Sequence, residues 1–91
     1  MERAYLARIS GRVTGVGFRY LAARRAAACA GLKGYVRNLG PGEVEVLAQG
    51  DAEEVDAFLS WLRAMPYPAR ITEFKLCELP LDLRREEFDI R

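Results

Sequence analysis

Histidine is absent from this chain of 91 residues. Its absence excludes a Ser-His or Cys-His catalytic pair, a phosphohistidine and any histidine-based metal site. Long apolar runs are missing too: none approaches the roughly 20 residues that cross a bilayer, and residues 1–10 lack the apolar core of a secretory signal peptide. We therefore expect a cytoplasmic protein with no membrane partner.

Cysteine is scarce, with 2 residues in the chain. Cys29 falls in a helical pattern and Cys77 in a strand pattern. The two could pair in principle, but in a cytoplasmic protein reduced cysteines behave as small core residues. We predict that both are reduced and packed in the core.

The chain also lacks an excess of charge of one sign. Lysine and arginine number 14 against 13 acidic residues, a net charge of +1. Such a balance provides no broad basic field, so we expect no nucleic-acid partner, and any anion site must be local. The 51% hydrophobic and 30% charged content is that of a soluble globular protein. A chain this short has enough apolar surface for one core, which predicts a single domain over residues 1–91.

Hydrophobic periodicity predicts the order strand, helix, strand, strand, helix, strand, followed by a short extra strand. Gly40-Pro41-Gly42 is a strong turn signal between the second and third strands, and Asp51 followed by Glu54 is typical of a helix capping box. The predicted ranges are a strand over 4–13, a helix from Phe18 to about Ala30, strands over 33–39 and 43–49, a helix ending before Pro66, and strands over 71–79 and 88–90.

This order predicts an α+β fold. Right-handed crossovers around each helix give an antiparallel sheet with both helices on one face, the ferredoxin-like or split βαβ sandwich, with a short additional C-terminal strand. Many unrelated functions use that fold, so the fold alone identifies none of them.

The stretch GRVTGVGFRY at 11–20 predicts a local anion site. A strand that turns through Gly15 and Gly17 into a helix presents free main-chain N–H groups at the positive end of the helix dipole. The stretch is neither a Walker loop, because no Gly-Lys-Ser/Thr follows, nor a dinucleotide-binding loop, because Tyr20 stands where the third glycine belongs. We predict an anion site that attracts phosphate in the stretch that runs from Gly15 through Val16, Gly17 and Phe18 to Arg19.

Two polar residues are candidates for the chemistry. A guanidinium at Arg19 offers bidentate bonds to phosphate oxygens, although a solvated surface arginine is the plain alternative. Asn38 lies near a strand end, and alternation places it on the face of Gly34 and Val36. It can then face the loop, although a turn-flanking asparagine remains the alternative.

Spaced motifs extend over almost the whole chain: G-R-V-T-G-V-G-F-R at 11–19, G-x-x-G-Y-V-R-N at 31–38, G-x-V-E-V at 42–46, and Gly50. In these motifs the chain resembles acylphosphatase, a family of small enzymes that hydrolyse the carboxyl-phosphate anhydride of acyl phosphates. The sequence departs from the family pattern in two places, with Thr14 where glutamine is common and Tyr35 where tryptophan is frequent. Neither departure replaces a residue that the family uses for chemistry.

The resemblance implies a catalytic pair in which Arg19 holds the phosphoryl oxygens and Asn38 positions the attacking water. It implies a small acyl phosphate as substrate and inorganic phosphate as product and competitive inhibitor. We expect no cofactor and a monomer. We also expect no metal, because the acidic residues Glu53, Glu54 and Asp56 surround a helix start and lack metal-ligand spacing.

Three other readings stay open. Lys33-Gly34-Tyr35-Val36 faintly resembles an RNA-recognition motif, whose domain shares this strand order. The chain could also be a phosphate-sensing module without turnover. A similar domain occurs in the much longer hydrogenase-maturation carbamoyltransferases, which act on carbamoyl phosphate.

Overall fold

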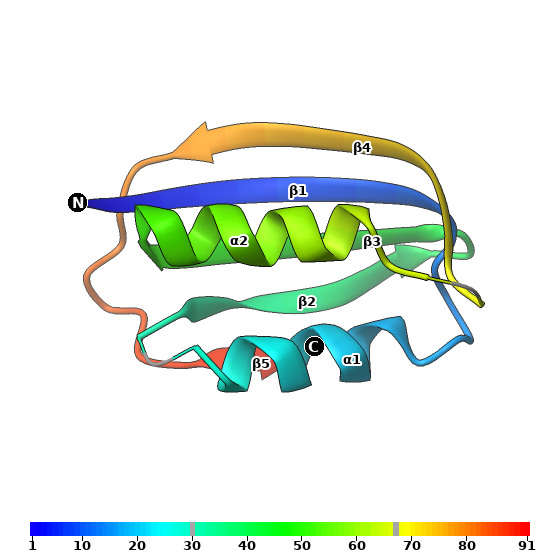
Figure 1. Cartoon of the computed structure of the whole chain (residues 1–91), viewed down its shortest axis with the longest axis horizontal. Coiled ribbons are helices and arrows are strands. Elements are labelled where there is room, and N and C mark those ends of the chain that lie inside the picture. Colours follow the sequence, from blue (N-terminus) through cyan, green and yellow to red (C-terminus); the bar gives the residue numbers. More distant parts are fainter. Residues whose placement is uncertain (30, 67) are drawn as a thin grey trace.

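The computed structural model describes residues 1–29, 31–66 and 68–91. Both helices lie on one face of a sheet (Figure 1), as the α+β prediction requires. In chain order the elements are β1 (Glu2–Arg12), α1 (Phe18–Ala27), β2 (Lys33–Gly40), β3 (Glu43–Asp51), α2 (Ala52–Arg63), β4 (Arg70–Leu79) and β5 (Phe88–Ile90).

The sheet has the strand order β4-β1-β3-β2-β5. Strand β1 pairs antiparallel with β3 and with β4, and β2 pairs antiparallel with β3, which confirms the ferredoxin-like arrangement. The short strand β5 instead pairs parallel with β2. Bonds from Gly34 N–H to Glu87 O (3.0 Å) and from Arg91 N–H to Val36 O (2.8 Å) extend this pairing. The chain thus returns from β4 to the opposite edge of the sheet and ends next to α1.

The core lies between the sheet and the two helices. Alternation along β1 and β3 directs every second side chain toward the helices, where β-branched residues pack well. The buried set includes Ala7, Ile9, Val36, Val44, Val46 and Ala48 from the strands and Phe18, Ala22, Phe58 and Leu62 from the helices.

Helix α1 is shorter than predicted. It ends at Ala27, where Ala28 N–H bonds to Arg25 O at 3.2 Å and Cys29 N–H to Ala26 O at 3.0 Å. These three-residue bonds tighten the chain after the last helical turn. The predicted end at Ala30 lies outside the described residues.

The prediction that both cysteines are packed in the core is wrong for Cys77. Cys29 is partly buried against the core and Cys77 is exposed, and both are free thiols. Cys77 pairs with Leu6, out of phase with the helix-facing Ala7. It therefore lies on the sheet face that the helices leave uncovered, in an edge strand. Within the described ranges, neither helix is long and apolar enough to span a bilayer.

Candidate active site

The loop from the end of β1 to α1 is fixed by apolar side chains at both ends. Val13 and Phe18 are each 1% exposed and bury into the core. Between them Gly15 (φ 72°) and Gly17 (φ 77°) adopt left-handed conformations that favour glycine. A Cβ on either would meet no protein atom within 4 Å. Backbone conformation, rather than crowding within the protein, therefore requires glycine here.

The N-terminus of α1 has unused donors. Its first helical bond runs from Leu21 N–H to Gly17 O at 2.9 Å, and Gly17 supplies no side-chain cap. In the part of the chain that the structure describes, the main-chain N–H groups of residues 15–20 have no protein acceptor. The first turn also contains no acidic residue. The positive end of α1 is therefore open to an external anion.

Arg19 is the second residue of α1 and is half-buried. Its Nη1 donates a hydrogen bond of 2.9 Å to the main-chain oxygen of Arg91, 72 residues away in sequence. The residue that follows strand β5 therefore orients the guanidinium. Sequence reasoning missed this partner, because no local pattern shows which sheet edge β5 will join.

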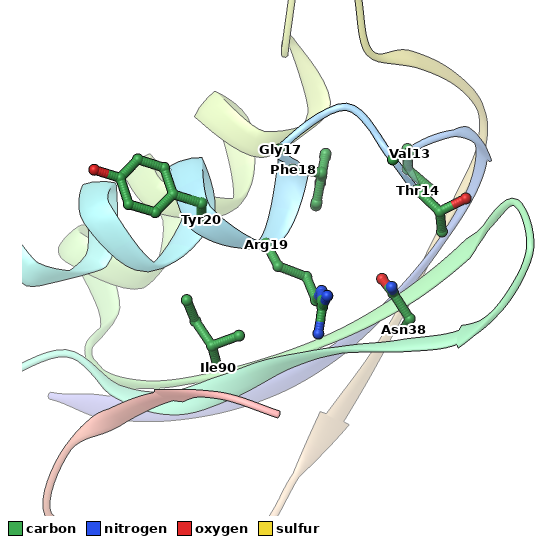
Figure 2. A pocket seen from close by; sticks show the side chains of 9 residues that line it. Val13, Thr14, Gly17, Phe18, Arg19, Tyr20, Asn38 and Ile90 are labelled. Atoms are coloured by element: carbon green, nitrogen blue, oxygen red, sulfur yellow. The ribbon is translucent and has the colours of Figure 1, made fainter.

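Asn38 approaches the same space from β2. It lies on the face of Gly34 and Val36, as the alternation predicts, and it is exposed just before a register irregularity between Asn38 and Gly40. Figure 2 shows the Arg19 guanidinium and the Asn38 carboxamide pointing into one space below the loop. The cavity has a volume of about 240 Å³ and is lined by Val13, Thr14, Gly15, Gly17, Phe18, Arg19, Tyr20, Asn38 and Ile90.

Val16 is the one predicted phosphate-binding residue that does not line this cavity. Its side chain packs partly buried against the core. Val16 can therefore bind an anion only through its main-chain N–H group.

The hairpin turn holds the loop in place. Gly42 accepts a hydrogen bond from Gly11 N–H at 3.0 Å, and Gly42 N–H donates to Thr14 Oγ1 at 3.2 Å. Thr14, one of the two departures from the family pattern, thus has a local role. These bonds fix the distance between the loop and the strand that carries Asn38.

Comparison with known proteins decides the family: the family model described as acylphosphatase matches residues 5–90. The chain belongs to the acylphosphatase family. An acylphosphatase of Paraburkholderia xenovorans is 47% identical over 85 residues, which cover 93% of this chain and 87% of that protein. The structure of an acylphosphatase from Coxiella burnetii superposes with a TM-score of 0.89 at 29% identity, covering 99% of this chain and 93% of that one.

A longer protein contains the same fold. The structure of HypF from T. kodakarensis matches with a TM-score of 0.83 at 33% identity, covering 98% of this chain but 12% of HypF. The family predicted from the sequence motifs is confirmed, and with it the class of enzyme, one that hydrolyses acyl phosphates.

Behind the site of this acylphosphatase, the outer face of the sheet carries a polar network that sequence reasoning also missed. Glu45 is 6% exposed and accepts hydrogen bonds from Tyr35 Oη (2.7 Å) and Arg37 Nε (2.8 Å). The Arg91 guanidinium lies 4.3 Å from the centre of the Tyr35 ring. Tyr35 therefore contacts the side chain of the residue whose main chain holds Arg19.

The network also sets the ionisation of its members. Burial alone would raise the pKa of Glu45, but the hydrogen bonds from Tyr35 and Arg37 outweigh burial and lower that pKa. Burial and the bond to Glu45 raise the pKa of the Tyr35 hydroxyl. Glu45 therefore remains a carboxylate at neutral pH although it is buried.

A larger cavity of about 450 Å³ lies along residues 82–91. Its lining combines four carboxylates with three arginines, so it offers an anion no net attraction. The described residues contain no group of three or more Cys, Asp or Glu side chains placed to hold a metal ion. The small cavity below the loop is therefore the candidate active site.

Proposed function

We propose that this acylphosphatase cleaves its substrate by direct attack of water on phosphorus. The observation that carries the proposal is that the Arg19 guanidinium and the Asn38 carboxamide point into one small cavity, which Gly15, Gly17 and Phe18 also line. The main-chain N–H groups at this helix N-terminus have no protein acceptor among the described residues. The substrate is a small acyl phosphate, and the products are a carboxylate and inorganic phosphate.

The loop and Arg19 bind the phosphoryl group. In this proposal the main-chain N–H groups from Gly15 to Arg19 donate to the phosphoryl oxygens at the positive end of the helix dipole, and the guanidinium adds charge-assisted bonds. In phosphoryl transfer the transition state is loose, with charge spread over the equatorial oxygens, so positioning and electrostatic stabilisation supply most of the catalysis. Fixing Arg19 on the Arg91 main chain prepares that stabilisation before substrate arrives.

Asn38 orients the water. The water oxygen forms a new bond to phosphorus while the bond between phosphorus and the carboxyl oxygen breaks, and the phosphate formed takes the water proton. The carboxylate leaves without protonation, since a carboxylic acid has a pKa of about 4 to 5, so no general acid is needed. Neither Cys29 nor Cys77 lines the cavity, which favours water over a covalent phosphoenzyme.

Hydrolysis of benzoyl phosphate by matched variants tests the proposal. We expect Arg19→Ala and Asn38→Ala each to lower kcat/KM by at least about 100-fold, the usual cost of removing a well-placed transition-state donor. Arg24→Ala is the matched control, because Arg24 is exposed on the same helix and lies outside the cavity. Circular dichroism should show the fold retained in all three variants.

Labelled water tests the direction of attack. In H₂¹⁸O the label should enter inorganic phosphate and not the carboxylate. Label in the carboxylate would place the attack on carbon and contradict the proposal. Inorganic phosphate should inhibit competitively, whereas phosphate binding without any turnover would favour a sensing module over an enzyme.

We further propose a monomeric, cytoplasmic, single-domain enzyme over residues 1–91 that needs neither metal nor cofactor. One continuous core supports the single domain, and the two free thiols fit a reducing compartment. Loss of turnover in EDTA with recovery on addition of magnesium would contradict the metal-independent reaction.

A further inference from the structure

Two large apolar side chains line the candidate active site and remain exposed. Tyr20 is 61% exposed and Ile90 is 48% exposed, and both belong to the cavity that contains Arg19 and Asn38. Tyr20 follows Arg19 along α1, and Ile90 lies in β5 opposite Val36. Neither belongs to the buried core, so packing within the protein does not explain their position.

Their placement relative to the polar pair is specific. In Figure 2 the Arg19 guanidinium lies between Asn38 on one side and Ile90 on the other, whereas the Tyr20 ring points away from this space. The cavity thus has a polar end, where Asn38 points in, and an apolar end, which Ile90 enters from the sheet.

In-line phosphoryl transfer gives these two ends different roles. The attacking oxygen and the leaving oxygen lie on opposite sides of phosphorus. With water held by Asn38 and phosphorus held at Arg19, the leaving carboxylate and its acyl group extend away from Asn38. They extend toward Ile90.

We propose that Ile90 forms an acyl shelf, an exposed apolar surface at the rim of the cavity that favours substrates with an apolar acyl group. This inference rests on the proposed function and adds the substrate class to it. The cavity volume of about 240 Å³ lies below the range of roughly 300–1,000 Å³ typical of sites that enclose a drug-sized ligand. The phosphoryl group occupies the cavity, and the acyl group lies across its rim on the shelf.

A comparison of two substrates tests the shelf. Ile90→Thr keeps the β-branched shape that suits β5 but removes the terminal methyl group and replaces the Cγ1 methylene by a hydroxyl. Each buried methylene contributes about fourfold to binding, so kcat/KM for benzoyl phosphate should fall about 3- to 10-fold. Acetyl phosphate has no group long enough to reach the shelf, and its kcat/KM should change by less than about twofold.

Two controls separate the shelf from a structural effect. Ile90 precedes Arg91, which holds Arg19, so the inhibition constant of inorganic phosphate is measured in parallel. Phosphate has no acyl group and should bind unchanged. Leu76→Thr is the matched surface variant, because Leu76 is also 48% exposed in a strand and lies outside the cavity.

The outcomes distinguish the two proposals. An equal fall for both substrates, weaker phosphate inhibition, or no fall for benzoyl phosphate would overturn the shelf and leave the hydrolase standing. A wild-type chain that hydrolyses neither substrate would overturn the proposed function itself. If Ile90→Thr does not fold, Ile90→Val, which removes one methylene and keeps the apolar β-branched shape, answers the same question with the same pair of substrates.

Discussion

The N-termini of the two helices are built in opposite ways. Helix α2 closes its own end: the Asp51 carboxylate accepts a bond from Glu53 N–H at 3.2 Å, and Glu53 and Glu54 add negative charge to the first turn. Helix α1 begins at Phe18 after the N-cap residue Gly17, has no side-chain cap and no acidic residue in its first turn, and carries Arg19 there instead.

The difference separates a helix N-terminus that the protein caps itself from one that it leaves open to an external anion. A side-chain cap typically contributes about 1 kcal/mol, and a cation near the positive end of a helix costs about 0.3 to 1 kcal/mol. Helix α1 lacks the stabilisation of a side-chain cap and carries the destabilising cation Arg19 in its first turn. An anion from outside the chain would offset both, as the proposed phosphate site requires.

Giving α1 the cap that α2 has should have the largest effect. Gly17→Asp places a carboxylate at the proposed phosphoryl-binding position, and we expect kcat/KM for benzoyl phosphate to fall by at least about 100-fold. Gly17→Asn is the control, because it has the same shape without the charge and asparagine tolerates a positive φ. Equal losses of kcat/KM in both variants would mean that backbone strain, and not the negative charge at the helix N-terminus, is responsible.

Filling the open end with phosphate should stabilise the fold. At a phosphate concentration about ten times Kd, the expected gain is about 1.4 kcal/mol. Because 1 kcal/mol shifts Tm by about 4–8 °C in a domain of this size, Tm should rise by about 6–11 °C. Arg19→Ala should lose most of this rise in a calorimetric scan. An unchanged rise in that variant would place the phosphate elsewhere.

Removing the side-chain cap of α2 should lower stability without affecting catalysis. Asp51→Ala removes the cap of α2, and we expect the free energy of unfolding to fall by about 1 kcal/mol. The value of kcat/KM should stay the same, because Asp51 lies outside the cavity. Urea denaturation and a benzoyl phosphate assay on the same sample measure both quantities. A substantial loss of activity in the folded variant would show that the two helix ends are coupled.

We expect the smallest effect from the Glu45 network on the outer face of the sheet, behind the candidate active site. The folded-state pKa of Glu45 lies below its ordinary value of 4.5, so its ionised form stabilises the fold above pH 4.5, and this contribution is lost as pH falls through the lower folded value. Glu45→Gln should therefore show a shallower loss of stability on acidification than the wild type. Unfolding midpoints measured from pH 6 to pH 3 provide the test, and parallel curves would contradict it.

Sequence patterns predicted the features that depend on neighbouring residues. Alternation placed Asn38 on the face of Val36, the change of period placed the start of α1 at Phe18, and Gly15 with Gly17 marked the turn before it. The errors arose where local signals compete or end. The alanine-rich stretch after Ala27 continues the helical pattern although the helix has stopped, and the strand pattern around Cys77 does not show which face the helices cover.

By itself, then, the sequence determined the order of the elements, the glycine conformations of the loop and the choice of Arg19 and Asn38 as candidates, because each depends on residues a few positions apart. Only the tertiary structure decided that β5 joins the edge of β2, that the Arg91 main chain holds Arg19, and that Ile90 reaches the cavity. Contacts across 72 residues depend on the path of the chain around the sheet, which local periodicity does not encode.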